Sequence, residues 1–137
     1  MNLESSFVIK NALLSSRILK KVDSELSIHG ISFTEYMVMH HLYLSSLKTM
    51  RRIELAECIG ISASGITRVI TPMERHNLVE KEANPRDARQ SLVKLSKVGE
   101  QLYKEASVSF EHRAEVILEP LSHNQLEKLI ELSSKLK

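Results

Sequence analysis

The sequence IELAECIGISASGITRVI, residues 53–70, predicts two short helices joined by a tight turn. Gly60 stands where a helix C-terminus favours a residue that can adopt a positive φ. Ser62, two residues later, is a suitable N-cap for a second helix. A helix, a tight turn containing glycine and a second helix form the helix-turn-helix pattern.

The second predicted helix has one apolar and one polar face. At about 100° per residue, its apolar side chains fall within one arc and its polar or cationic side chains lie opposite. The apolar set is Ala63, Ile66, Val69, Ile70 and Met73, and the opposite set is Ser64, Arg68, Thr71 and Arg75. In a helix-turn-helix protein the second helix enters the DNA major groove. The polar face therefore predicts a DNA-reading surface.

Two alternating segments, 78–82 and 91–95, follow this helix and predict two strands. The turn-rich sequence ANPRDARQ, residues 83–90, joins them. A hairpin with a basic tip directly after a recognition helix is a wing. Residues 49–51 predict a further short strand before the helix-turn-helix.

Long helical patterns flank this central part. Residues 3–28 predict one helix that ends at Gly30, and residues 96–119 predict another that ends before Pro120, with a last helix near the C-terminus. Their apolar stripes are too extensive for a small DNA-binding module to bury alone. We therefore expect a homodimer in which terminal helices of both subunits pack together.

These patterns predict a mostly α fold with a small β-hairpin wing, in a single domain spanning 1–137. The terminal helices, 1–30 and 96–137, would dimerise, and 32–95 would form the winged helix-turn-helix lobe. No apolar run approaches the ~18 residues of a membrane span, and the start does not read as a signal peptide. A single cysteine is typical of a reducing compartment, so we expect a cytoplasmic protein.

The distribution of charge is more informative than the net charge of +2. Residues 49–97 hold nine Lys or Arg against six Asp or Glu, whereas the remainder holds ten against eleven. The positive excess therefore lies in the segment with the helix-turn-helix, as expected for a protein that binds a polyanion.

The sequence resembles the MarR family of bacterial winged-helix regulators, and the resemblance covers essentially the whole chain. The matching segments are Glu54–Ala56, Ile59–Ser62, Thr67–Arg68, Met73–Val79, the wing 84–89 and Leu95–Gly99. Three positions depart from the family pattern. Arg51 stands where a hydroxyl residue often caps the first helix of the motif, and Ala88 replaces a frequent basic residue. Asn77 replaces a usual glycine, and we expect it to be the left-handed residue that ends the recognition helix.

The resemblance implies that Thr67 and Arg68 contact DNA from the recognition helix. Arg68 can donate two hydrogen bonds to guanine, and Thr67 can touch a thymine methyl or a phosphate. The alternative for Arg68 is a solvated surface side chain. Ser62 and Ser64 are expected to contact phosphates or base edges, with N-capping as the main role of Ser62.

The resemblance places Arg89 of the wing in the DNA minor groove. Asp87 is expected to orient Arg89, or another nearby arginine, rather than to touch DNA, because phosphates repel a carboxylate. The alternative is that Asp87 and Arg89 form a structural turn pair of small energetic value. Weaker candidates for phosphate contacts are Arg86, Arg51, Arg52 and Arg75.

The family also includes regulators that respond to small aromatic or anionic effectors, to zinc and to oxidants. Tyr36, His40 and Arg17 are candidates to line an effector pocket, although the sequence assigns no ligand set. Cys58 is interpreted as a partly buried packing residue. The histidines offer no compact zinc motif. His40 and His41 would have to approach Glu25 or His29 and, across the fold, Glu111 or His112.

The sequence thus predicts a homodimeric regulator that binds double-stranded DNA at a pseudo-palindromic operator, as a repressor released by a small-molecule effector. No Gly-rich phosphate loop, metal-ligand cluster or nucleophile motif indicates an enzyme, and we expect no cofactor or metal. The alternatives are a winged-helix protein-interaction module without DNA function, or a zinc- or thiol-responsive regulator of the same family.

Overall fold

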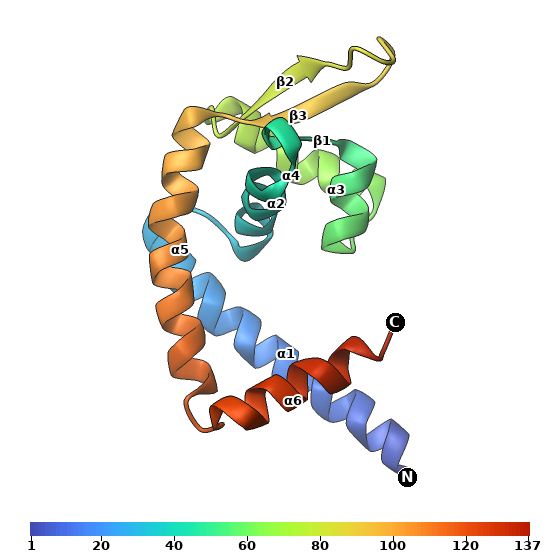
Figure 1. Ribbon diagram of the computed structural model, residues 1–137, viewed down its shortest axis with the longest axis vertical. Coiled ribbons are helices and arrows are strands. Elements are labelled where there is room, and N and C mark those ends of the chain that lie inside the picture. The colour runs from blue at the N-terminus through green and yellow to red at the C-terminus, as the bar shows by residue number, and fades with distance from the viewer.

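The computed structural model describes residues 1–137 and shows a lobe of short helices and strands carried on long helices (Figure 1). The elements are α1 (Leu3–Leu26), α2 (Phe33–Leu44), β1 (Thr49–Arg51), α3 (Arg52–Ile59), α4 (Ala63–Arg75), β2 (Val79–Ala83), β3 (Ser91–Leu95), α5 (Lys97–Leu118) and α6 (His123–Ser134), with short 3-10 turns at Ser27–His29 and Ser46–Lys48. The prediction of a mostly α fold with a small β-hairpin wing is confirmed.

Short polar motifs fix the ends of the helices. Ser32 and Glu35 form a capping box at α2, in which the Glu35 N–H donates to the Ser32 hydroxyl and the Ser32 N–H donates to the Glu35 carboxylate. Ser122 and Gln125 repeat this arrangement at α6. Gly60 has φ +81° after α3, as the sequence predicted for the turn of the helix-turn-helix.

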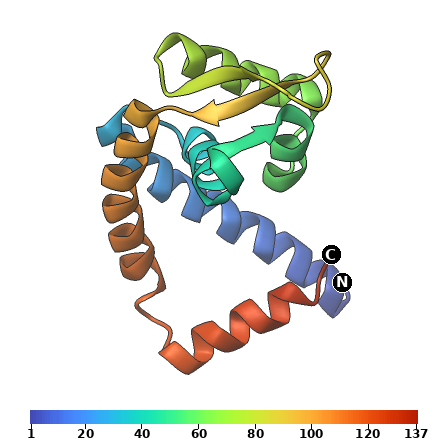
Figure 2. The same cartoon turned by 45° about the horizontal axis from the view of Figure 1, so that its top comes forward.

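The three strands form one antiparallel sheet in the order β1-β3-β2. Val93 of the central strand is paired with Met50 on one side and Lys81 on the other, and its side chain is buried. The hairpin of β2 and β3 projects beyond α3 (Figures 1 and 2). All three predicted strands are therefore present, with β2 displaced by one residue from the prediction.

The hydrophobic core lies within the lobe and extends to the parts of α1 and α5 that support it. Val22 and Leu26 of α1 and Tyr103 and Ala106 of α5 belong to one buried cluster with side chains of α2, α3, α4 and the sheet. Its largest fully buried members are Leu26, Met39, Leu42, Leu55, Ile66, Ile70 and Met73. Burial of these groups is the main favourable term that holds the helix-turn-helix in place.

Ser96 provides the one buried polar side chain of the chain. Its hydroxyl donates to the Asn77 carbonyl oxygen at 2.6 Å and accepts from the Gly99 N–H at 2.9 Å. Its own N–H donates to the Leu78 carbonyl oxygen at 3.1 Å. Asn77 has φ +61°, as predicted for the residue that ends the recognition helix. The Ser96 junction thus joins the end of α4, the end of the wing and the start of α5.

Aromatic and imidazole side chains join α2 to α5. The Tyr36 hydroxyl lies 2.8 Å from the Ser107 hydroxyl, and His40 Nδ1 lies 2.7 Å from the Tyr103 hydroxyl. Burial raises the pKa of Tyr36 to about 12. Burial and the neighbouring His41 lower the pKa of His40, so the neutral imidazole is favoured in the folded chain.

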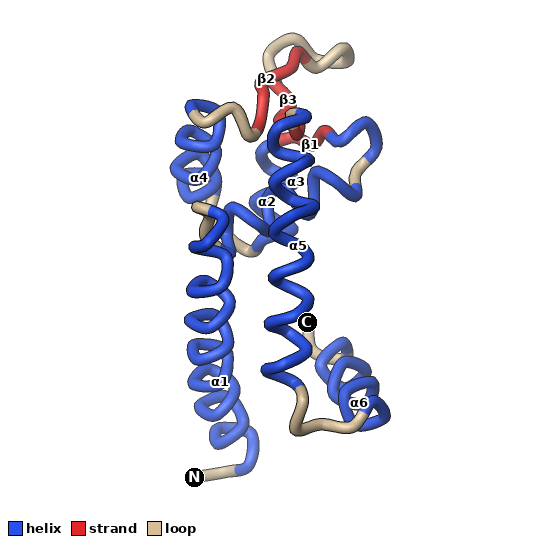
Figure 3. Tube along the Cα trace, turned by 90° about the vertical axis from the view of Figure 1, so that its left-hand side faces the viewer, coloured by secondary structure: helices blue, strands red, loops and turns tan.

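The helices below the lobe leave many apolar side chains in solvent. Figure 3 shows α6 standing apart from α1, and no residue of α6 is buried. Phe7 of α1 is 52% exposed and Leu14 is 49% exposed. None of the helices has the combination of length and hydropathy needed to cross a membrane.

Replacing Gly99 by alanine should destabilise the fold, because an added Cβ would overlap the Leu78 carbonyl oxygen and lie 2.8 Å from a Leu95 methyl. We expect the free energy of unfolding in urea to fall by about 2–4 kcal/mol. Gly65→Ala is the matched control. Its Cβ would lie 3.1 Å from the Ser62 hydroxyl and in ordinary contact with Ile61 at 3.6 Å, without overlapping backbone, and the substitution would gain helix propensity. Equal stability of the two variants would contradict the close packing at Gly99.

The lowered pKa of His40 predicts that the fold loses stability on acidification. The unfolded chain takes up a proton near pH 6.5, before the folded chain does, so the melting temperature should fall as the pH drops below 6.5. The melting temperature of His40→Asn should depend less on pH than that of the wild-type protein. Identical profiles for wild type and His40→Asn would rule out this contribution.

Candidate nucleic-acid interface

The outer face of α4 is polar and exposed, as its sequence predicted. Ile66, Ile70 and Met73 are fully buried, and this orients the opposite side of the helix toward solvent. The exposed side chains are Ser64, Thr67, Arg68, Thr71 and Arg75. No carboxylate lies within 4.0 Å of the Arg68 or Arg75 guanidinium groups. Both arginines therefore present an uncompensated positive charge.

Hydroxyl groups in the first turns of α4 are engaged by the helix itself. Ser62 caps α4 by accepting the Gly65 N–H at 3.0 Å, and its hydroxyl lies 3.2 Å from that of Ser64. The Thr67 hydroxyl donates to the Ala63 carbonyl oxygen at 3.2 Å. The predicted capping role of Ser62 is confirmed. Because its hydroxyl proton is used within the helix, Thr67 is better suited to offer its methyl group to a ligand.

The turn of the wing is organised by two short polar side chains. Asp87 Oδ1 accepts from the Arg89 N–H at 3.0 Å and lies 3.4 Å from Arg89 Nε. Asn84 Oδ1 accepts from the Arg86 N–H at 3.0 Å. The predicted contact of Asp87 with Arg89 is therefore present, and the Arg89 side chain remains 93% exposed. The backbone of Arg89 is fixed while its guanidinium is exposed, and this arrangement suits insertion of the guanidinium into a groove of a nucleic acid.

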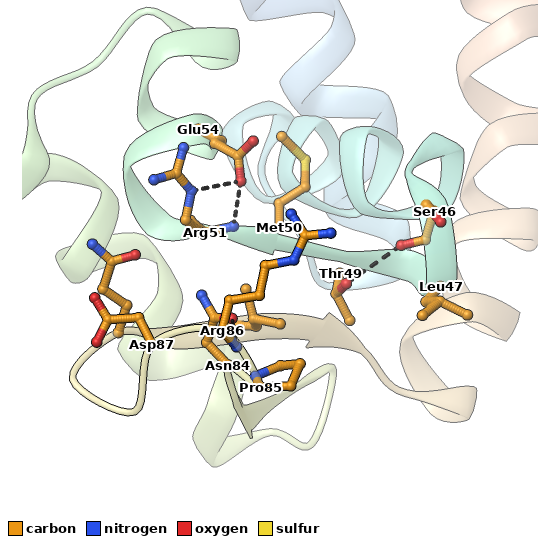
Figure 4. A pocket seen from close by; sticks show the side chains of 12 residues that line it. Ser46, Leu47, Thr49, Met50, Arg51, Glu54, Asn84, Pro85, Arg86 and Asp87 are labelled. Atoms are coloured by element: carbon orange, nitrogen blue, oxygen red, sulfur yellow. Dashed lines mark hydrogen bonds and ion pairs between the residues drawn. The ribbon is translucent and has the colours of Figure 1, made fainter.

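A groove of about 620 Å³ separates the turn of the wing from β1 and the start of α3 (Figure 4). Arg51 and Glu54 form one wall, and Arg86 extends from the opposite wall toward Met50. The Arg51 N–H donates to Glu54 Oε1 at 2.9 Å, which lowers the pKa of Glu54. This bond also settles the start of α3, where Arg51 occupies the N-cap position without a hydroxyl.

The predicted phosphate-contact arginines differ in their surroundings. Arg52 Nη2 lies 2.9 Å from Glu74 Oε1, an ion pair between α3 and α4 that the sequence analysis did not anticipate. Arg51 is paired with Glu54 at 3.2 Å, and both groups are more exposed than the Arg52–Glu74 pair. A pair formed by residues 22 positions apart has no local sequence signature, so only the packing of α3 on α4 reveals it.

The interpretation of Cys58 as a partly buried residue is wrong, because its side chain is exposed. Leu55, Ala56 and Ile59 define the inward arc of α3. At about 100° per residue, Cys58 lies about 110° from the centre of that arc, on the side of Glu54. The helix therefore turns the thiol outward.

Among the candidate zinc and effector residues, His29, His40 and Tyr36 have hydrogen-bond partners within the fold, whereas the buried His41 Nε2 has none. His29 Nε2 lies 2.8 Å from the Ser109 hydroxyl, and His40 and Tyr36 are bonded to residues of α5. Tyr36 is buried in the core. No group of three or more His, Cys, Asp or Glu side chains is placed to hold a metal ion.

Comparisons with known proteins agree with this architecture. The model of the MarR family matches residues 29–90. AbsC, a MarR family transcriptional regulator from Streptomyces coelicolor, is 24% identical, with a TM-score of 0.85 over 100% of this chain and 92% of AbsC. At these identities the structures establish a shared fold.

Several of the similar structures were solved as DNA complexes. Sco3205, a MarR family regulator from Streptomyces coelicolor in complex with DNA, is 19% identical with a TM-score of 0.88, over 99% of this chain and 90% of its own. A mutant MarR from E. coli, complexed with operator DNA, is 18% identical with a TM-score of 0.85, over 99% of both chains. The family model, which matches residues 29–90, and the fold shared over nearly the whole chain both point to the MarR family of transcriptional regulators.

Proposed function

We propose that this chain is a homodimeric, sequence-specific DNA-binding repressor. The observation that carries the proposal is the uncompensated Arg68 on the solvent face of α4, together with an exposed Arg89 that Asp87 holds on the wing. A helix inserted into the major groove and a wing beside it would use these two guanidinium groups for different parts of one site. The DNA complexes of Sco3205 and of E. coli MarR support the assignment.

The charges around these two residues favour DNA over a protein partner. A protein-interaction surface has no requirement for exposed arginines on both the second helix and the wing. Phosphate contacts from Arg75, Arg86 and Arg51 would supply affinity that depends on salt, and Arg68 and Arg89 would supply base and groove recognition. Ser64 and Thr67 complete the proposed reading face.

Dimerisation follows from the apolar side chains that α1 and α6 leave in solvent. An isolated helix of 12 residues is marginal in water, so α6 needs a packing partner that its own chain does not provide. We infer that the corresponding helices of a second copy cover this surface. Two copies would present their recognition helices to half-sites ~34 Å apart on one face of the duplex.

Repression would follow from occupation of a promoter by this dimer. The lobe joins the terminal helices through α1 and α5, so the spacing of the two recognition helices depends on how these helices pack. A small effector would release the DNA only if it bound one spacing more tightly than the other. The structure assigns no residue set to this effector.

The central prediction concerns Arg68 and Arg89. In gel-shift titrations with the DNA upstream of its own gene, Arg68→Ala and Arg89→Ala should each weaken specific binding about 10- to 100-fold and reduce the preference for that DNA over other sequences. Lys104→Ala removes an exposed cation of α5 outside the lobe and is the control, with affinity unchanged.

Uniformly weak binding to every DNA, unaffected by either arginine substitution in folded protein, would contradict this function. That result would favour the protein-interaction alternative. Circular dichroism melting curves of the variants exclude unfolding as the cause of lost binding.

A second prediction concerns the assembly state. Light scattering should give the wild-type chain twice the subunit mass of 15.6 kDa. Phe7→Glu with Leu14→Glu should shift it to the subunit mass, because two charges would be buried without partners. Leu47→Glu alters an equally apolar side chain that is 84% exposed within the lobe, and this control should remain dimeric. A monomeric wild type would refute the proposed dimer.

A further inference from the structure

One ion pair joins the first turn of α3 to the last turn of α4. Arg52 is the first residue of α3, and Glu74 precedes the last residue of α4. Arg52 Nη2 lies 2.9 Å from Glu74 Oε1, and the two side chains are 29% and 32% exposed. This partial burial weakens solvent screening and holds the groups in one geometry better than a fully exposed pair would.

The ion pair closes the helix-turn-helix at the end opposite to its turn. Gly60 and Ser62 join α3 and α4 covalently at one end, and Arg52 and Glu74 join them at the other. Two helices connected at one end only can still change their angle and roll. A second connection removes much of this freedom.

Pro72 makes the second connection more important. Proline has no N–H, so the Arg68 carbonyl oxygen lacks the helical donor four residues later. The turn beyond Pro72 is therefore less firmly tied to the rest of α4 by its backbone. Met73 anchors this turn on the apolar side, where it is fully buried, and Glu74 anchors it through Arg52.

We propose that Arg52 and Glu74 are positioning residues, whose ion pair fixes the angle and roll of α4 and so the presentation of Arg68 to DNA. This inference rests on the proposed DNA-reading function of α4. Glu74 follows Arg68 by six residues, which places it about 120° around the helix. The pair can therefore hold α4 from the side while Arg68 remains free.

The inference reverses what charge alone predicts for Glu74. Near DNA a carboxylate repels phosphates, so its removal should strengthen binding if it acts only as a charge. Loss of a positioning carboxylate should instead weaken binding to the correct sequence while leaving binding to other DNA little changed. The ratio of these two affinities separates the two roles.

The test begins with a duplex that the wild-type protein selects from a random DNA library. Dissociation constants for this duplex and for a scrambled duplex of the same length are then measured across a salt series. The variants are Glu74→Gln, Arg52→Gln, the double variant and Arg52→Lys. Glu57→Gln is the matched control, because Glu57 is an exposed carboxylate of α3 without an ion-pair partner.

For Glu74→Gln we expect the ratio of specific to non-specific affinity to fall about 5-fold. The ratio in the double variant should be no lower than in either single variant, because the two residues act through one ion pair. Arg52→Gln should lower the ratio similarly and keep the wild-type salt slope for the selected duplex. Arg52→Lys, which retains a cation, should recover at least half of the loss. Glu57→Gln should keep the wild-type ratio.

Three results would overturn the positioning role in variants that melt as folded proteins. The first is a ratio of specific to non-specific affinity in Glu74→Gln equal to that in Glu57→Gln. The second is that the effects of the two single substitutions add up in the double variant. The third is a salt slope lowered by about 1 in Arg52→Gln, because such a change marks a phosphate contact. Failure of the wild-type protein to select any sequence would instead refute the proposed function itself.

Discussion

The hydrogen bonds of Ser96 are the constraint on which the arrangement of the reading elements depends. The Ser96 hydroxyl and N–H join the backbone at the end of α4, the base of the wing and the first turn of α5. Gly99 allows the closest approach, because a side chain there would overlap the Leu78 backbone. Ser96 therefore connects α4, which would read DNA, to both the wing and α5. A change in the direction of α5 would be passed directly to the other two.

The arginines of the lobe divide into two groups that contribute differently. Arg51, Arg52 and Arg89 each have a carboxylate partner, and these three pairs set the start of α3, the join of α3 to α4 and the turn of the wing. Arg68, Arg75 and Arg86 have none. The paired arginines define the local structure, and the unpaired ones leave positive charge available on α4 and on the wing. The pairs do not change the net positive excess of this part of the chain, but they leave Arg68 and Arg75 as free cations on the outer face of α4.

Much of the fold could be predicted from the sequence because its signals are local. The capping box at Ser32, the N-cap at Ser62 and the left-handed Asn77 each depend on a few neighbouring residues, and all three are present. The contact of Asp87 with Arg89 was predicted for the same reason. The exposure of Cys58 could also have been predicted, because helical periodicity places this residue about 110° from the centre of the apolar arc of α3.

Features that depend on distant residues were beyond the sequence analysis. The Arg52–Glu74 pair exists only because α4 returns beside the start of α3. The hydroxyl and imidazole contacts between α2 and α5 likewise join residues more than sixty positions apart. The DNA-contact roles of Arg68 and Arg89 remain predictions, since no partner is bound to either group.

Hydroxyl-radical footprinting of the wild-type protein on a selected duplex tests the central claim most directly. A dimer that reads DNA with α4 and the wing should protect two symmetric segments whose centres lie about 10 base pairs, or a multiple of one helical turn, apart on one face of the duplex. Flanking minor-groove protection should disappear with Arg89→Ala. A single asymmetric protected segment, or none, would contradict the account.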